Sequence, residues 1–467
     1  MPATTARLPT PYRDEARVLA ELLQGLSGPL DWPAAMDTAR PWVEAVREHP
    51  APFWAMESLL REYPISSAEG LALMRLAEAL LRVPDAETAI ALTADQLGKA
   101  EFDARGHEGP GAARSAGGQH KLLANLSASA IALSKRFLPG RDDEGGLFKR
   151  LGAQTVVAAT VRAIQLLGRQ FVLGRSIAEA MIEAAAARKS HANVQRAASA
   201  HAGLRFSYDM LGEGARTEAD AQRYLASYLH AIQAIAAANQ ARGPEQADGI
   251  SIKLSALFSR YEDAQRERVM NELLPRVWQL IEPAARANLN LTIDAEESDR
   301  LELSLDVLEA LAARIAASFP QWRGFGLAIQ AYQTRALQVV DEVARIARAH
   351  RLRFMVRLVK GAYWDGEIKR AQELGLTGYP VFTHKHHTDI SYLACTRALI
   401  GHQDVIYPQF ATHNAGTIAA ILGLAKAQGA AFEMQRLHGM GEGIYREVMR
   451  GDAAIPVRVY APVGQHR

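Results

Sequence analysis

The sequence Phe354-Met-Val-Arg-Leu-Val-Lys-Gly-Ala-Tyr-Trp364 joins a strand-like run to the start of a helical one. Residues 354–359 are mostly apolar, as in a buried strand, and residues 365–373 follow with a helical pattern. Gly361 lets the backbone approach a ligand closely, and the helix would direct its free N–H groups to the same place. Two cations and two aromatic residues lie in this turn: Arg357, Lys360, Tyr363 and Trp364. The turn therefore predicts a site for a cofactor that carries phosphate and a ring.

Strand-like runs recur from residue 204 onward, separated by intervals with a helical pattern. The eight runs are 204–209, 249–254, 289–294, 326–330, 354–360, 380–385, 405–412 and 431–435. Eight strands with helical crossovers predict a parallel sheet of the α/β class, which closes naturally into a (βα)8 TIM-like barrel. The alternative is an open, doubly wound sheet, which is disfavoured because no Gly-x-Gly-x-x-Gly follows the first strand.

Almost every predicted strand ends in a polar or charged residue. These residues are Asp209, Lys253, Asp294, Gln330, Arg357 with Lys360, Lys385, His413 with Asn414, and Gln435. In a barrel of parallel strands these ends gather at one mouth, where active sites lie. One polar strand end would be unremarkable, since it could cap a helix or face solvent. The repetition predicts a functional site at the C-terminal mouth.

Lys253 and Asp294 each allow several readings. Lys253 has apolar residues on both sides, so its ammonium group could reach solvent or pair with a nearby carboxylate. It could also bind a substrate carboxylate, or form a Schiff base, because burial depresses the pKa of a lysine. Asp294 could equally serve function or cap the next helix. The residues alone leave these alternatives open.

The histidine-rich sequence Thr383-His-Lys-His-His-Thr388 raises the question of a metal site. Adjacent His386 and His387 on a strand end would point to opposite sides, and no acidic ligands stand at matching strand ends. We therefore predict no metal, and expect the hydroxyls and lysine of this sequence to contact phosphate and ribityl groups. Residues 411–414 could form either a structural turn or an edge of the cofactor site.

The totals describe an ordinary soluble protein with room for two or three domains: 467 residues, 49% hydrophobic and 22% charged. A net charge of +2 gives no electrostatic case for binding nucleic acid. The single cysteine, Cys395, leaves no internal disulfide and fits a reducing compartment. The N-terminus lacks a secretory signal, and no apolar run reaches the roughly 18 residues that span a membrane. We predict a cytoplasmic protein.

Four regions are expected along the chain. Residues 1–45 read as a helical arm and 46–102 as a small helical domain, with apolar residues at three- and four-residue spacing. Residues 103–146 are rich in Gly, Ala and polar residues without periodicity, which is typical of a linker and connecting segment. Residues 147–467 would begin with an Ala-rich helical region and then form the barrel.

Seven sequence motifs together resemble one family. They are Gly249-Ile-Ser-Ile-Lys-Leu-Ser-Ala-Leu257, Leu291-Thr-Ile-Asp-Ala-Glu-Glu297, Arg357–Trp364, Thr388-Asp-Ile-Ser-Tyr-Leu-Ala-Cys395, Phe410-Ala-Thr-His-Asn414, Leu437-His-Gly-Met-Gly-Glu442 and Val459-Tyr-Ala-Pro-Val-Gly464. From about residue 20 onward the chain resembles the proline dehydrogenase domain of the bacterial bifunctional proline utilization A flavoenzymes. The N-terminal helices resemble that family's arm and helical domain. The ribbon-helix-helix segment of some members is absent, so no nucleic acid partner is expected.

The family binds FAD, and the resemblance implies contacts residue by residue. It implies that Arg357 lies near flavin N5, that Gln330 meets the flavin ring, and that Trp364 lies near the adenine. The dinucleotide-phosphate turn would comprise Val359, Lys360, Gly361 and Ala362, with Tyr363 as a neighbouring aromatic residue. The further FAD contacts implied are Thr383, Lys385, Thr388, Thr412, His413, Asn414, Gln435 and Leu437.

The resemblance also implies the reaction, which is the first step of proline catabolism. L-Proline would be oxidised to Δ1-pyrroline-5-carboxylate by hydride transfer from C5 to flavin N5, and a quinone would accept the electrons. Lys253 would pair with the carboxylate of proline, with Asp294 in the same pocket. Leu437 and Tyr460 would pack on the pyrrolidine ring. A homo-oligomer and peripheral membrane association of the full-length protein are compatible with the family.

The sequence departs from the family after Gly464. There the family has a final barrel helix with two adjacent arginines for the proline carboxylate and a glutamate for FAD, whereas this sequence stops at Arg467. The family's aldehyde dehydrogenase half is missing as well. The expectation is that these 467 residues hold FAD loosely and oxidise proline poorly until that helix is added. The alternatives are an FAD-binding fragment with little activity and a barrel lyase that uses Lys253 as a Schiff base.

Overall fold

The computed structural model describes residues 7–48, 171–194, 203–240, 243–451 and 455–464. The described arm and the barrel belong to one compact unit. Most of the predicted small helical domain (46–102) and the whole predicted linker (103–146) lie outside the described residues, so the predicted domain boundaries stay predictions.

Eight parallel strands form a closed barrel in which each strand pairs with its neighbours in sequence and β8 pairs with β1. The strands are β1 (Leu204–Met210), β2 (Gly249–Ile252), β3 (Asn290–Ile293), β4 (Phe325–Gln330), β5 (Phe354–Val359), β6 (Ile406–Ala411), β7 (Glu433–Leu437) and β8 (Val457–Val463). They are almost wholly buried, because side chains fill the barrel and helices cover its outside. The predicted α/β barrel is confirmed.

Two details of the strand prediction are wrong. Residues 380–385 form no strand: Val381 makes one isolated antiparallel bridge with Gln333, and a helix begins at Lys385. The eighth strand is instead β8, which pairs with β1 over seven residues from Leu204 opposite Val457 to Met210 opposite Val463. The run at 380–385 is apolar because Val381 and Phe382 pack into the core, although no parallel strand lies beside them.

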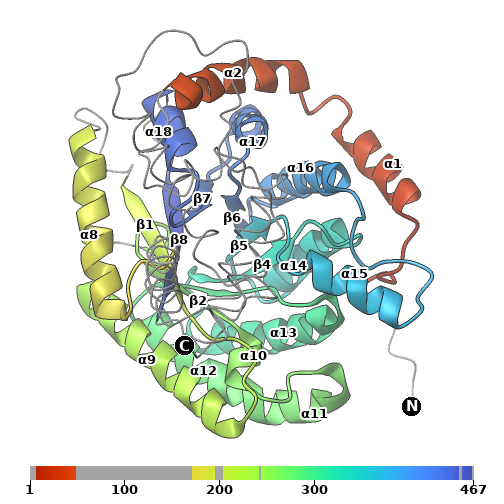
Figure 1. Cartoon of the computed structure of the whole chain (residues 1–467). Helices are drawn as coiled ribbons and strands as arrows, with labels where there is room; N and C mark the ends of the chain where they lie inside the picture. Colours follow the sequence, from red (N-terminus) through yellow and green to blue (C-terminus); the bar gives the residue numbers. More distant parts are fainter. Residues whose placement is uncertain (1–6, 49–170, 195–202, 241–242, 452–454, 465–467) are drawn as a thin grey trace, which may run out of the picture. The chain divides into compact units, whose positions relative to one another are not determined.

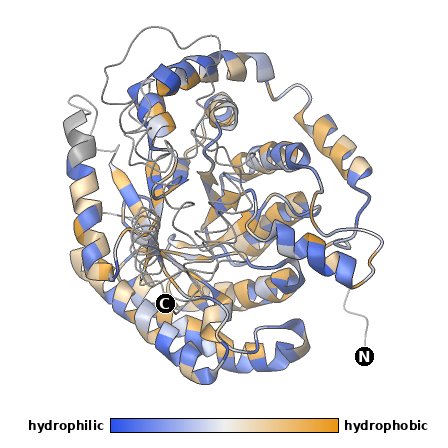
Figure 2. Ribbon diagram, viewed as in Figure 1, coloured by the Kyte–Doolittle hydropathy of each residue, from blue (hydrophilic) through white to orange (hydrophobic). Residues whose placement is uncertain are grey.

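Helices connect the strands and cover the outside of the barrel (Figure 1). They are α8 (Ile177–Val194), which precedes β1, α9 (Glu218–Ala238), α10 (Leu254–Leu257), α11 (Arg266–Arg268), α12 (Leu274–Arg286), α13 (Leu301–Ser318), α14 (Ala336–Ala349), α15 (Trp364–Glu373), α16 (Lys385–Gly401), α17 (Ala415–Gln428) and α18 (Glu442–Gly451). The outer helices carry both hydrophobic and hydrophilic residues in Figure 2, as expected for helices with one buried face. Two helices, α15 and α16, follow β5, and the start of α16 matters for the site below.

The N-terminal arm consists of α1 (Glu15–Leu26) and α2 (Trp32–Glu48), which lie along the outer helices α16 to α18 (Figure 1). Its buried side chains are Val18, Leu22, Leu26, Ala35 and Ala39, which form one apolar cluster with Phe382, Leu393, Ala394, Ala419 and Ala420. The predicted helical arm is thus found in the described part of the chain. No helix within the described ranges is long and apolar enough to cross a membrane.

Candidate active site

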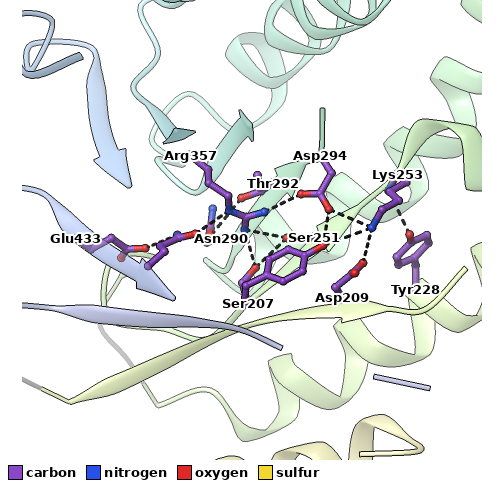
Figure 3. A network of polar contacts seen from close by, with 12 residues as sticks. Ser207, Asp209, Tyr228, Ser251, Lys253, Asn290, Thr292, Asp294, Arg357 and Glu433 are labelled. Carbon is purple, nitrogen blue, oxygen red and sulfur yellow. Dashed lines mark hydrogen bonds and ion pairs between the residues drawn. The ribbon is translucent and has the colours of Figure 1, made fainter. Parts of the chain in front are cut away.

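Four polar side chains meet at the C-terminal mouth of the barrel (Figure 3). The ammonium group of Lys253, just after β2, lies 2.9 Å from Asp209 Oδ1 and 3.3 Å from Asp294 Oδ2. The hydroxyl of Tyr460 on β8 donates to the same Asp294 oxygen at 2.9 Å. Asp209, Lys253 and Asp294 lie at or just after the ends of β1, β2 and β3, as the repeated polar strand ends predicted, whereas Tyr460 lies within β8, which was not predicted.

Arg357 on β5 extends this cluster toward the barrel interior. Its guanidinium donates to Asp294 Oδ1 at 2.7 Å and to Gln435 Oε1 at 2.8 Å. It also donates to the hydroxyls of Ser207 at 3.1 Å and Ser251 at 2.9 Å. With only 2% of its surface exposed, Arg357 is a buried cation whose donors are satisfied from four other strands.

The charges of the cluster set its protonation. Burial disfavours the ammonium form of Lys253, but Tyr460, Asp294 and Asp209 outweigh burial and raise its pKa well above the ordinary value. Burial raises the pKa of Asp209 despite the adjacent Lys253. Burial likewise raises the pKa of the Tyr460 hydroxyl well above its ordinary value. Lys253 is therefore held as a cation and Tyr460 as a neutral hydrogen-bond donor.

Gln435 links the mouth to a charged pair deeper in the barrel. While its amide oxygen accepts from Arg357, its amide nitrogen donates to Glu433 Oε1 at 2.9 Å. Glu433 forms a fully buried ion pair with Arg458 of β8, 2.6 Å away, and also accepts from Gln409 at 2.8 Å. The structure thus gives Gln435 a clear role in orienting Arg357, and its predicted contact with FAD stays a prediction.

The turn after β5 is tied to β4 by Gln330. Its amide oxygen accepts from the N–H of Ala362 at 3.1 Å, and its amide nitrogen donates to Glu296 O at 2.8 Å. Gly361 in this turn has φ of 144°, and a Cβ there would lie 2.4 Å from the ring of Tyr332. Only glycine fits this turn without displacing that ring.

Val359 and the two aromatic residues mark the passage from strand to helix that the sequence predicted. Val359 ends β5, Tyr363 precedes the first turn of α15, and Trp364 begins that helix with 41% of its surface exposed. The indole N–H of Trp364 donates to Phe382 O at 2.8 Å, which joins the turn to the segment before α16. The turn therefore presents an aromatic surface next to that segment.

Lysines from two separate segments converge on one carboxylate. Lys360, after β5, and Lys385, at the start of α16, both pair with Asp389; the second pair measures 3.1 Å. Burial would raise the pKa of Asp389, but hydrogen bonds from both lysines lower it. Thr383 precedes α16, and Thr388 lies buried in its first turn. Lys385 and Thr388 therefore lie at the N-terminus of a helix. The prediction that Lys385 ends a strand was wrong.

The loop after β6 forms a hydrogen-bonded turn, which was one of the two alternatives that the sequence left open. Asn414 caps α17 by accepting from Thr417 N at 2.9 Å, while the hydroxyl of Thr412 accepts from Asn414 N at 3.2 Å. His413 Nε2 accepts from Leu437 N at 3.0 Å. Burial, with the nearby cations Arg436 and Lys360, lowers the pKa of His413 to about 4. This loop is a structural turn, and its FAD contacts stay predictions.

Leu437 and Tyr460 lie directly opposite each other on β7 and β8. The ring of Tyr460 also lies beneath the guanidinium of Arg357, 4.9 Å from it. Both predicted ring-packing residues therefore stand side by side at the mouth, next to Lys253 and Asp294.

The residues of the mouth fit an anionic dinucleotide. Lys360 and Lys385 supply positive charge, and α15 and α16 begin beside them, so the free N–H groups of two helix starts could bind an anion there. Among the described residues, no group of three or more His, Cys, Asp or Glu side chains is arranged to hold a metal ion. His386 and His387 lie in the first turn of α16, so the strand geometry assumed for them was wrong.

Several residues of the site were missing from the sequence-based prediction. Asp209 was predicted to end a strand but was not predicted to belong to the site, although its place at a strand end already indicated the mouth of the barrel. Ser207 and Ser251 lie inside strands and look like ordinary small residues, and Glu15 of the arm is remote in sequence from its partner Thr383. Only the tertiary structure brings these partners to the mouth.

Known proteins with similar sequences belong to one family. Residues 192–467 match the sequence model of the proline dehydrogenase family. The chain is 45% identical over 424 residues to the bifunctional protein PutA of Escherichia coli K12, covering 88% of this chain and 30% of that protein. It is 43% identical over 443 residues to PutA of Rhizobium meliloti, covering 93% of this chain and 34% of that protein. The chain thus spans about a third of the length of these relatives.

Solved structures give the same result. A crystal structure of proline utilization A from Bradyrhizobium japonicum, a D779Y mutant, shares 44% sequence identity with a TM-score of 0.71, covering 99% of this chain and 44% of that one.

Residues 55–171 match a second sequence model, which is described as the DNA-binding domain of proline dehydrogenase. That description does not support the expectation of no nucleic acid partner, which stays a prediction.

Proposed function

Because this chain belongs to the proline dehydrogenase family, we propose that it oxidises L-proline to Δ1-pyrroline-5-carboxylate at the C-terminal mouth of the barrel, with FAD as cofactor. The observation that carries the proposal is the cluster of Lys253, Arg357, Asp209 and Asp294, two cations beside two carboxyl groups. Proline is a zwitterion with one carboxylate and one ammonium group. A buried cluster with both signs of charge can replace the water that each of these groups loses on binding.

Lys253 would bind the carboxylate of proline. Its side chain is only 13% exposed, and both aspartates and Tyr460 hold it in place and keep it charged. Leu437 and Tyr460 would cover the apolar face of the pyrrolidine ring, since they lie opposite each other on adjacent strands. Asp294 joins Lys253 to Arg357, so it would couple substrate binding to the flavin side of the site.

FAD would lie across the mouth from Arg357 to the start of α16. Arg357 would sit beside the isoalloxazine ring, and Lys360, Gly361, Lys385 and Thr388 would bind the phosphates and the ribityl chain. When bound, FAD supplies the hydride acceptor, at its N5 atom, and passes on the electrons to a quinone. The protein's part is to orient proline, keep water out and hold fixed charges around the flavin.

The lyase alternative is disfavoured by the charge on Lys253. A Schiff-base lysine must be neutral to attack a carbonyl, and burial can depress its pKa for that purpose. Here the surrounding Tyr460, Asp294 and Asp209 outweigh burial, and the pKa is raised. Lys253 is therefore suited to bind an anion.

The test is anaerobic reduction of the flavin by proline in this chain. The purified protein is loaded with FAD, and L-proline is added while the visible absorbance of the flavin is followed. We expect slow bleaching that saturates with L-proline, because the family's arginine-bearing helix is not part of these 467 residues, and faster bleaching when that helix is added as a peptide. Replacing Lys253→Met should raise the proline concentration needed for half-maximal bleaching by at least about tenfold, because a buried charged partner is lost.

The control is Lys369→Met, which removes an exposed lysine from α15. It should bleach as the wild type does. FAD binding without bleaching would contradict the proposed reaction and favour the FAD-binding alternative. Failure to bind FAD, combined with trapping of a carbonyl compound on Lys253 by borohydride, would favour the lyase.

DNA binding is the second function to consider, because residues 55–171 match a model that is described as DNA-binding. Basic and acidic residues nearly balance in this stretch, which gives little attraction to phosphates. We therefore keep the prediction of no nucleic acid partner. Fluorescence anisotropy with labelled duplex DNA at low salt tests it, and salt-dependent binding would overturn it. A cytoplasmic location, peripheral membrane contact and homo-oligomerisation also stay predictions.

A further inference from the structure

The arm carries one carboxylate that reaches the segment before α16. Glu15, the first residue of α1, accepts from Thr383 N at 3.0 Å through Oε1 and from the Thr383 hydroxyl at 2.7 Å through Oε2. His387 Nδ1 contacts the same Oε1. Thus one side chain of the arm is bonded to a backbone N–H, a hydroxyl and an imidazole, all within five residues of the chain.

Both sides of the segment 380–387 are fixed. On the barrel side, Phe382 N donates to Tyr332 O at 2.7 Å, and Phe382 O accepts from Trp364. On the outer side, Glu15 supplies the contacts just described. The side chain of Glu15 is only 23% exposed. Burial alone would raise the pKa of Glu15, but hydrogen bonds from His387 and Thr383 lower it, so the carboxylate stays charged.

The arm also binds the loop after β4. The hydroxyl of Thr334 donates to Pro11 O at 2.8 Å, and Arg13 donates back to Thr334 O at 3.1 Å. The N–H of Thr334 in turn donates to Pro380 O at 3.1 Å. The arm therefore contacts both loops that flank the predicted dinucleotide site, and joins them to each other.

We propose that Glu15 is a positioning residue of the cofactor site: by holding Thr383 and His387, it fixes the N-terminus of α16 in the geometry that binds the phosphates. The inference rests on the proposed function, because the ligand it serves is FAD. It adds a role for the arm, whose described residues make no hydrogen bond to Lys253 or Arg357 and reach the site through α16 and the β4 loop.

The geometry also constrains what Thr383 does. Its hydroxyl hydrogen is directed to Glu15, so toward a ligand it offers only lone pairs. Phosphate oxygens are acceptors as well and gain nothing from such a group. Thr383 would therefore suit a hydroxyl or amine donor of the cofactor, whereas Lys385, at the start of α16, would suit the phosphates.

The test compares Glu15→Ala with Glu21→Ala. Glu21 lies on the same helix and is 48% exposed, and its partners Arg13 and Arg17 belong to the arm itself. Two measurements are made: hydrogen exchange of the backbone in residues 380–389 of the protein without FAD, and the dissociation constant for FAD by fluorescence titration. Glu15→Ala should speed the exchange and raise the FAD dissociation constant about tenfold or more, because several charge-assisted hydrogen bonds are lost.

Glu21→Ala should leave both quantities unchanged. At saturating FAD, Glu15→Ala should keep the wild-type KM for proline, because Glu15 contacts α16 and the proposed proline site is formed by β2, β3, β7 and β8. Glu15→Gln, which retains one acceptor, should fall between Ala and wild type, and it keeps the test valid if Glu15→Ala fails to fold. Adding His387→Ala to Glu15→Ala should cost little more, because the two residues act together.

An unchanged FAD dissociation constant in Glu15→Ala, with faster exchange, would overturn the inference and reduce Glu15 to a docking contact of the arm. If the wild type itself binds no FAD, the proposed function fails, and the cofactor role of Glu15 falls with it. Tight wild-type binding that Glu15→Ala retains would remove the inference alone. The two failures are thus distinguishable.

Discussion

Arg357 is a cation from β5 whose hydrogen-bond partners come from four other strands: Ser207 of β1, Ser251 of β2, Asp294 after β3 and Gln435 of β7. A charge placed at the centre of a barrel is tolerated only when every donor finds an acceptor. Removing the side chain would take from Asp294 its 2.7 Å ion pair and leave it with Tyr460 and Lys253. The same residue therefore contributes to stability and to the charge beside the flavin.

Arg357→Met should be less stable than the wild type by about 3–5 kcal/mol, the usual loss when one member of a buried ion pair is removed. It should also weaken FAD binding or lower the reduction potential of the flavin. Urea denaturation and potentiometry measure these effects. Arg348→Met, which breaks an exposed pair with Asp404, is the control and should change stability by about 0–1 kcal/mol. Equal effects of both substitutions would show that Arg357 has been misplaced.

Tyr460 allows the ring and the hydroxyl to be tested separately. Tyr460→Ala removes the apolar ring beneath Arg357 and should weaken proline affinity by about 1–3 kcal/mol. Tyr460→Phe keeps that ring but removes the donor to Asp294, so it should retain most of the affinity. Proline titrations at constant flavin content give both values. Wild-type affinity in the Ala variant would be inconsistent with ring packing.

At the scale of elements, seven of the predicted strand runs coincide with observed strands, because short apolar runs between helical intervals are a strong pattern in α/β barrels. The run at 380–385 failed because burial alone makes a segment apolar: Val381 and Phe382 are in the core without a parallel partner. β8 was missed as a strand because Arg458 and Pro462 interrupt its apolar pattern. Arg458 is tolerated there because Glu433 neutralises it.

The site was predictable to the extent that its residues follow strands. Lys253 and Asp294 follow β2 and β3, as the pattern of polar strand ends predicted, and the roles of these residues and of Leu437 and Tyr460 stay predictions. Their supporting residues could not be found in this way. Glu433 and Gln409 meet only because β6 and β7 pair, and Glu15 reaches Thr383 only because the arm lies along α16.

The loop after β6 predicts a pH effect. His413 accepts the N–H of Leu437 only when its imidazole is neutral. Its pKa is about 4 in the folded chain against an ordinary value of 6.5, so between these values the unfolded chain binds more protons. The stability from this group is therefore fully present above about pH 6.5 and is lost as pH falls toward 4.

His413→Gln keeps an acceptor and removes the titration. Its stability should fall less between pH 6.5 and 4 than that of the wild type, as measured by urea denaturation at several pH values. His230→Gln, which changes an exposed histidine of α9, is the control and should keep the wild-type slope. Parallel slopes in all three proteins would contradict the lowered pKa of His413.

At the scale of the whole molecule, one fully buried pair ties the barrel together. Arg458 of β8 and Glu433 of β7 are both 0% exposed. Arg458 also donates to Ala247 O and Pro244 O, before β2. Glu433 accepts from Gln409 of β6 and Gln435 of β7, and Gln435 holds Arg357. The interior of the barrel and the candidate site therefore share one hydrogen-bond network.

Glu433→Ala should destabilise the chain by about 3–5 kcal/mol, because it leaves Arg458 as an uncompensated buried charge. The double variant Glu433→Leu with Arg458→Met should recover much of that loss, since no charge is then buried. Chemical denaturation measures both. Lys369→Met, in an exposed pair with Glu373 on α15, provides the comparison and should change stability by about 0–1 kcal/mol. A double variant less stable than Glu433→Ala would contradict this expectation, and would show that the ion pair stabilises the chain more than apolar side chains do at the same positions.

The pairing of β1 with β8 has a consequence for how the chain is synthesised. The first strand leaves the ribosome long before its partner, and at about 5–20 residues per second the delay is roughly ten to fifty seconds. During this time one edge of β1 is unpaired and open to pairing with other nascent chains. Parallel pairing between strands so distant in sequence is also slow. Expression with abundant holdase chaperones should therefore raise the soluble yield, and fast, strong induction should drive the chain into inclusion bodies.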